Sequence, residues 1–140
     1  MLSVFLHYNF EQSLSLTRFF GKKFEAFALK EFIFGLLPSS QKIGKWWHKE
    51  EEIDIVALNE ESKEIAFFEC KWSGLRKKET EKIFSELKCK AALVKWQNSE
   101  RKERYGIIAR TIEGKEVFRV KGYFAFDLED WLKHGRFLFR

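Results

Sequence analysis

Residues 52–72 read EIDIVALNEESKEIAFFECKW, and their pattern predicts the centre of the fold. The runs EIDIVAL (52–58) and IAFFECKW (65–72) have the length and the β-branched and aromatic content of buried strands. The polar run NEESKE (59–64) between them predicts a hairpin turn. We therefore expect two adjacent antiparallel strands inside a sheet.

The segment before this hairpin predicts a long helix over about residues 17–37, which Pro38 ends. Its expected buried stripe has helical spacing and consists of Phe20, Phe24, Phe27, Ala28 and Phe34. A strand over 43–48 should join this helix to the hairpin.

The segment after the hairpin predicts a helix over about 78–95 and strands over 105–110 and 123–126. Asp127 should cap a short last helix, with Asp130 in its first turn and Trp131 inside it. Residues 111–122 fit either a hairpin or a loop. The order of elements predicts an α/β fold with a mixed central sheet flanked by helices.

A chain of 140 residues with a net charge of +5 fits one domain that favours a polyanionic partner. The core should span about residues 17–110, with the last strand and helix over about 123–134. Cys70 and Cys89 fit neither a disulfide framework nor a metal cluster, which predicts reduced thiols and a cytoplasmic location. We find neither a secretory signal nor an apolar run that would cross a membrane.

One Glu-x-Lys pattern differs from the others in its surroundings. The pattern begins at Glu61, Glu69, Glu86, Glu100 and Glu113. Only Glu69-Cys70-Lys71 lies inside an apolar strand, where charges are costly unless they have a partner or a use. This contrast makes Glu69 and Lys71 candidates for chemistry.

Strand pairing brings Asp54 into the same candidate site. If Asn59 pairs with Glu64, then Asp54 lies opposite Glu69, and unbroken alternation puts Asp54, Glu69 and Lys71 on one face. Ile53, Ile55 and Ala57 would form the other face of their strand. Two such close carboxylates repel each other unless a cation lies between them, and their oxygens suit Mg²⁺. A purely structural charge cluster remains an equal alternative at this point.

Three motifs together resemble a known family. Gly44-Lys45-Trp46-Trp47, Glu52-Ile53-Asp54-Ile55-Val56-Ala57 and Phe68-Glu69-Cys70-Lys71-Trp72 are similar to the domain of unknown function at the C-terminus of archaeal ATPases, which is assigned to the PD-(D/E)XK nuclease superfamily. The resemblance covers about residues 19–96. It implies a restriction-endonuclease-like core in α-β-β-β-α-β order and a Mg²⁺- or Mn²⁺-dependent endonuclease that hydrolyses phosphodiester bonds in DNA.

The resemblance also implies a role for each residue. Asp54 and Glu69 would be metal ligands, together with the backbone carbonyl of Cys70, and Lys71 would be the catalytic lysine. Glu25 on the first helix would be a further metal or water contact, with Glu31 as a rival. Ile53 stands where the superfamily usually has proline.

The sequence contains no phosphate-binding loop, so the ATPase half of the usual arrangement is missing. This leaves three possibilities: a nuclease, a catalytically silent nucleic-acid-binding or interaction module with the same fold, or a domain that works with an ATPase in trans. The abundance of Lys and Glu and the scarcity of Asn, Gln, Met and Cys are typical of hyperthermophile proteins.

Several surface features suggest where partners bind. Basic residues on segments flanking the candidate site could contact phosphates, with an ordinary solvated surface as an equal alternative for each: Lys22, Lys23, Lys42, Lys45, Arg76, Lys77 and Lys78. Trp46 and Trp47 are neighbours on one strand, so at least one should be core and the other could stack on bases. The apolar chain ends, 4–10 and 137–139, predict a homodimer.

Overall fold

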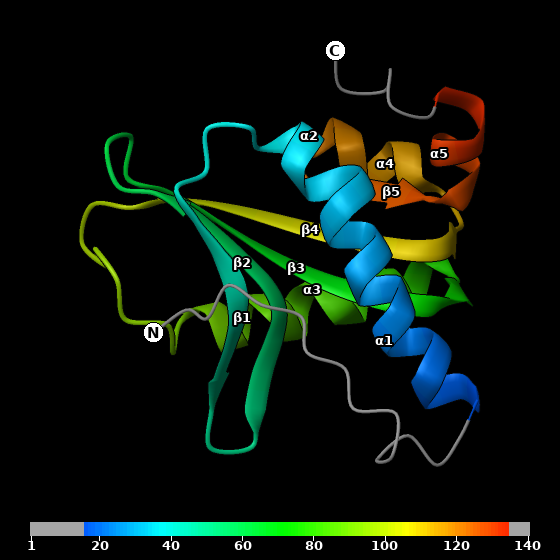
Figure 1. Ribbon diagram of the computed structural model, residues 1–140, viewed down its shortest axis with the longest axis horizontal. Helices are drawn as coiled ribbons and strands as arrows, with labels where there is room; N and C mark the ends of the chain where they lie inside the picture. The colour runs from blue at the N-terminus through cyan, green and yellow to red at the C-terminus, as the bar shows by residue number, and fades with distance from the viewer. Residues whose placement is uncertain (1–15, 135–140) are drawn as a thin grey trace.

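A computed structural model describes residues 16–134, with side chains described for residues 21–133. Figure 1 shows a single sheet with helices on both faces. The elements in chain order are α1 (Leu16–Ala28), η2 (Leu29–Ile33), α2 (Phe34–Leu36), β1 (Lys42–His48), β2 (Glu51–Asn59), β3 (Glu64–Leu75), α3 (Lys77–Ala91), β4 (Lys102–Ile112), α4 (Lys115–Val120), β5 (Phe124–Asp127) and α5 (Leu128–His134).

The five strands form one sheet in the order β1-β2-β3-β4-β5. β1, β2 and β3 pair antiparallel, whereas β4 runs parallel to β3 and β5 runs parallel to β4. Each parallel step contains a helix, because parallel neighbours need a crossover connection. The predicted α/β fold with a mixed sheet flanked by helices is therefore confirmed, and it is compatible with a restriction-endonuclease-like core.

Helices cover the two faces of the sheet unequally. Residues of α1 and η2 pack with Ile55, Phe68 and Ile108 on one face, where Trp131 of α5 joins them. On the other face Leu87 of α3 packs against β2 and β3, and Phe118 of α4 packs near β4 and β5. Figure 1 shows α1 in front of the sheet and α3 behind it. Any residue that faces α1 therefore points away from α3.

The first helix departs from the expected stripe after Ala28. A π-helical turn, η2, inserts an extra residue, so the helical face rotates by about one residue. Phe32 and Ile33 are consequently fully buried, whereas Phe34 is 52% exposed. The prediction that Phe34 belongs to the buried stripe is wrong, while Phe24 and Ala28 are buried as expected. The Phe20 side chain lies outside the described part of the chain.

Residues 111–122 contain α4 rather than the expected hairpin or loop. Gly114, at φ 68°, starts this six-residue helix, which buries only Phe118. So short a helix has no repeating apolar stripe that the sequence could reveal.

The cap expected at the last helix is present. Asp127 and Asp130 exchange backbone-to-carboxylate hydrogen bonds at the start of α5. Lys115 and Arg119 of α4 neutralise these two buried carboxylates, at distances of 2.7–3.2 Å. This second charge cluster joins α4 to α5 and explains why its acids can be buried.

Both chain ends proposed for dimerisation, 4–10 and 137–139, lie outside the described residues. Within residues 16–134, no helix is both long and apolar enough to cross a lipid bilayer.

Candidate functional site

A β-bulge in β2 determines where Asp54 points. Gly44 pairs with Val56 but Trp46 pairs with Ile53, so Asp54 and Ile55 together oppose the single residue Lys45. The side chains confirm this irregularity. Ile53 packs with Val56 on the α3 face, whereas Ile55 packs on the α1 face. The expectation that Ile53 and Ile55 share a face is wrong, because the bulge interrupts the alternation.

The bulge turns Asp54 toward α1, and Glu69 points toward α3. Phe68 and Cys70 belong to the α1-facing core, so Glu69 between them faces the other way. The two carboxylates therefore approach the sheet from different sides, and the prediction of one shared face is wrong. They still interact, because the charge of Asp54 is among the main causes that raise the pKa of Glu69.

Asp54 also fills a gap between β2 and β3. The expected register is confirmed from the Asn59–Glu64 pair as far as Ile55–Phe68, where the pairing ends. Beyond it the backbone N–H of Cys70 donates a 2.8 Å hydrogen bond to Asp54 Oδ2. N–H and C=O of one strand residue point to the same neighbour, so the Cys70 carbonyl faces this gap as well.

Glu25 of α1 joins Asp54 through Lys45. Lys45 Nζ lies 3.6 Å from Glu25 Oε2, 3.6 Å from Glu52 Oε1 and 4.0 Å from Asp54 Oδ1. Burial, and next the charge of Asp54, raise the pKa of Glu25 to about 7. The sequence placed Lys45 among phosphate-contacting residues; the structure places it inside the carboxylate cluster.

Glu69 has a partner that sequence reasoning missed. Lys90 of α3 donates a hydrogen bond from Nζ to Glu69 Oε1 at 3.2 Å. Burial and the Asp54 charge nevertheless raise the pKa of Glu69 to about 8. The only available signal was the spacing of Lys90 three residues after Leu87 and next to Ala91, both buried on the α3 face.

Lys71 differs from the other lysines at the site. Its side chain is half-buried, and it forms no ion pair or hydrogen bond with the side chains described, those of residues 21–133. Its charge lowers the pKa of nearby Glu69. Among the described side chains, Lys71 therefore has no direct ion-pair or hydrogen-bond partner, although its charge acts on Glu69. The Cys70 thiol is buried, which raises its pKa and keeps it protonated.

Of the remaining candidate residues, some lie next to the carboxylate cluster and others lie farther from it. Glu31, the rival of Glu25, accepts a 3.3 Å hydrogen bond from Trp131 Nε1 and so has a different partner. Lys42 pairs with Glu60 at the turn end of the hairpin, away from Asp54. The exposed residues Arg76, Lys77 and Lys78 begin α3 beyond the end of β3, and Lys22 and Lys23 lie on α1 just before Glu25.

The donor groups fit a divalent cation by their chemistry. Asp54, Glu69 and the Cys70 carbonyl supply the hard oxygens that Mg²⁺ and Mn²⁺ prefer. Burial, and next the charge of Asp54, raise the pKa values of Glu25 and Glu69 although Lys45 and Lys90 lie beside them. Among the side chains of residues 21–133, no three acidic, cysteine or histidine groups already converge on one point. A bound cation would therefore replace or displace ammonium contacts at this site.

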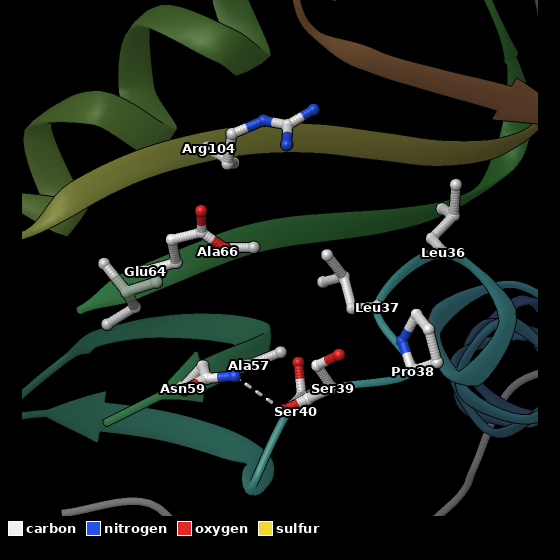
Figure 2. Close-up of a pocket in the computed structure, with 11 residues that line it drawn as sticks. Leu36, Leu37, Pro38, Ser39, Ser40, Ala57, Asn59, Glu64, Ala66 and Arg104 are labelled. Atoms are coloured by element: carbon white, nitrogen blue, oxygen red, sulfur yellow. Dashed lines mark hydrogen bonds between the residues drawn. The ribbon is translucent and has the colours of Figure 1, made fainter. Parts of the chain in front are cut away.

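The pocket in Figure 2 is separate from this cluster. It has a volume of about 210 Å³ and includes Ser39, Asn59 and Arg104. Asn59 Nδ2 donates to the Ser39 carbonyl across it. It lies at the turn end of the β2–β3 hairpin and contains none of the candidate residues.

Comparisons with known proteins identify relatives without an assigned activity. A family model described as archaea bacterial proteins of unknown function matches residues 5–83, which include Glu25, Asp54, Glu69 and Lys71 but not Lys90. An uncharacterized protein of Methanocaldococcus jannaschii is 38% identical over 120 residues, which cover 81% of this chain and 26% of that protein. The chain thus spans about a quarter of this curated relative. No solved structure matches the chain.

Proposed function

We propose that this chain, which belongs to the family of archaea bacterial proteins of unknown function, is a metal-dependent endonuclease domain that hydrolyses phosphodiester bonds in DNA. The observation that carries the proposal is the gap between β2 and β3. There the Asp54 carboxylate meets the backbone of Cys70, and the residues on either side of Cys70 are Glu69 and Lys71, which forms no ion pair with a described side chain. The resemblance to the PD-(D/E)XK superfamily, which rests on the same residues, supports this proposal.

The chain's own groups would divide the work. Asp54, Glu69 and the Cys70 carbonyl would hold Mg²⁺ or Mn²⁺, which supplies Lewis-acid activation of the scissile phosphate when bound. Lys71 is available to orient the attacking water and to stabilise charge that develops on the phosphate. Glu25, with its pKa near 7, is suited to accept a proton at neutral pH.

A second candidate function is a catalytically silent module that binds nucleic acid or an ATPase partner. The ion pairs Lys45–Glu25 and Lys90–Glu69 favour it, because ammonium groups already provide part of the charge that a metal would supply. The short span of the chain relative to its longer relative also leaves room for a partner domain. Cleavage separates this candidate from the nuclease.

The test is a cleavage screen of the full chain on duplex, branched and single-stranded DNA, with Mg²⁺, Mn²⁺ or chelator. We expect cleavage that requires the metal. Lys71→Ala and Asp54→Asn should each lower the rate by at least about a hundredfold, the scale of losing one electrostatic contact in a transition state. Lys133→Ala, which removes an exposed lysine on α5, is the matched control. Cleavage that persists in chelator, or in the double variant, would exclude the mechanism.

A further inference from the structure

A groove of about 970 Å³ runs along edge strand β1 and the end of α3. Its aromatic and charged lining consists of Lys42, Trp46, Trp47, His48, Lys95 and Trp96. Aliphatic side chains, including Leu58, Ile65 and Leu93, form its floor. The groove does not contain the candidate acidic residues.

Trp47 is a large apolar side chain that the fold leaves exposed. Trp46 is buried in the core, and alternation along β1 directs Trp47 outward, where it is 53% exposed. Leu93, also lining the groove, is 47% exposed. Large apolar groups gathered at one exposed place mark a binding site more often than chance exposure does. The indole ring offers a flat face to an incoming planar group.

The charges of the groove favour an anionic ligand. Lys42 and Lys95 line it, and none of its lining residues is a carboxylate. Lys95 forms no ion pair with any described side chain, whereas Lys42 is held by Glu60. Aromatic faces beside unpaired ammonium groups are the combination that recognises unstacked bases on a phosphate backbone.

The groove lies near the candidate site. Leu93, Val94 and Lys95 follow directly after the end of α3, whose residue Lys90 contacts Glu69. On the strand side, Trp46 pairs with Ile53, the residue before Asp54. A chain lying in the groove would therefore extend toward the acidic residues.

We propose that this groove binds a single-stranded nucleic acid, with bases stacked on Trp47 and Trp96 and backbone phosphates contacted by Lys95. This inference extends the proposed function and rests on it, because the proposed nuclease activity is the reason for binding a strand here. It specifies the substrate as one with an unpaired strand, because bases within a duplex cannot stack on protein side chains.

Binding of a short fluorescent oligothymidylate to the full chain, measured by anisotropy in chelator, tests the proposal without cleavage. Trp47→Ala should weaken binding by roughly five- to 150-fold, the range for losing one stacked base, and Trp47→Phe should keep most of the affinity. Lys95→Ala should reduce the salt slope of the binding constant by about 0.7, the value for one phosphate contact to a single strand. Val120→Ala, at an 87% exposed position on α4, is the control and should bind as the wild type does.

Four outcomes would overturn the proposal: no binding, Trp47→Ala binding equal to wild type, tighter binding of a duplex than of the single strand, and loss of self-association as the only effect of Trp47→Ala. The last outcome would identify the groove as a contact between copies. Because the assay contains no metal, stacking can be supported while the cleavage screen is negative. Equally, metal-dependent cleavage with unaltered Trp47→Ala binding would support the nuclease and reject the groove.

Discussion

The backbone N–H of Cys70 donates its hydrogen bond to the Asp54 carboxylate, at 2.8 Å, where the ladder between β2 and β3 has ended. A buried N–H needs an acceptor, and here a side chain supplies it in place of the neighbouring strand. Asp54 therefore has a structural task in addition to its proposed chemical one. Its charge also repels the carboxylates of Glu25 and Glu69, and after burial it is the next cause that raises the pKa of each.

Asp54→Asn and Asp54→Ala should separate these two effects in metal-free buffer at pH 8. The amide keeps an acceptor for the Cys70 N–H and removes the charge repulsion with Glu25 and Glu69. Asp54→Asn should therefore raise the free energy of unfolding by about 1 kcal/mol, somewhat less than the free energy that corresponds to a shift of one pKa unit. Asp54→Ala leaves the N–H without a partner, which costs about 1–3 kcal/mol. Urea unfolding measures both. An Asn variant less stable than the Ala variant would contradict the role of the hydrogen bond.

The stability of the wild type in chelator should fall as pH rises from about 5.5 to 8.5. Glu25 and Glu69 have folded-state pKa values of about 7 and about 8, above the ordinary value of 4.5. The folded state therefore binds more protons than the unfolded state in this range, and stability is lost as these protons leave. Each group contributes a slope of at most about 1.4 kcal/mol per pH unit.

Urea unfolding at several pH values measures this slope, with Glu25→Gln and Glu69→Gln as comparison variants. Each variant should flatten the profile, because it removes one of the two titrating groups. A wild-type profile that rises over this pH range, or variants with unchanged slopes, would show that these acids are not held in a protonated state.

The sequence predicted the hairpin well because its register depends only on local information. Apolar alternation and the NEESKE turn were enough to pair Asn59 with Glu64 and Leu58 with Ile65. The bulge could not be predicted from the sequence, because Asp54 and Ile55 each fit an ordinary strand. The extra residue appears only in the pairing of β2 with β1. The faces assigned to Ile53 and Asp54 were wrong for that reason.

Lys90 shows a second limit of the sequence. It lies 21 residues from Glu69, and packing of α3 against the sheet brings the two together. Its spacing from Leu87 and Ala91 indicates the side of α3 that faces the sheet, but it does not identify Glu69 as the partner. Glu25 is different, because the resemblance named it before the structure placed it beside Lys45 and near Asp54.

The π-helical turn makes Phe32 and Phe34 a matched pair. Phe32→Ala should destabilise the protein by about 3–5 kcal/mol, because it empties a fully buried site. Phe34→Ala, at a 52% exposed position two residues on, should cost less than about 1 kcal/mol. Thermal or urea unfolding compares them. Similar losses in both variants would mean that the helix keeps regular α-helical phase through η2.

Lys45→Met should show whether the Lys45 ammonium group occupies the site where a divalent metal ion would bind. Lys45 lies within 4.0 Å of carboxylate oxygens of Glu25, Glu52 and Asp54, so its removal leaves these charges uncompensated. In chelator the variant should lose about 1–3 kcal/mol of stability. Mg²⁺ or Mn²⁺ should restore it, and the increase in Tm on adding metal should exceed that of the wild type, because metal no longer competes with the lysine.

The control is Lys133→Met, which breaks an exposed pair with Glu129 and should respond to metal as the wild type does. Equal metal shifts in the Lys45→Met and Lys133→Met variants would mean that Lys45 and the cation do not share a site, and would favour the silent module over the nuclease.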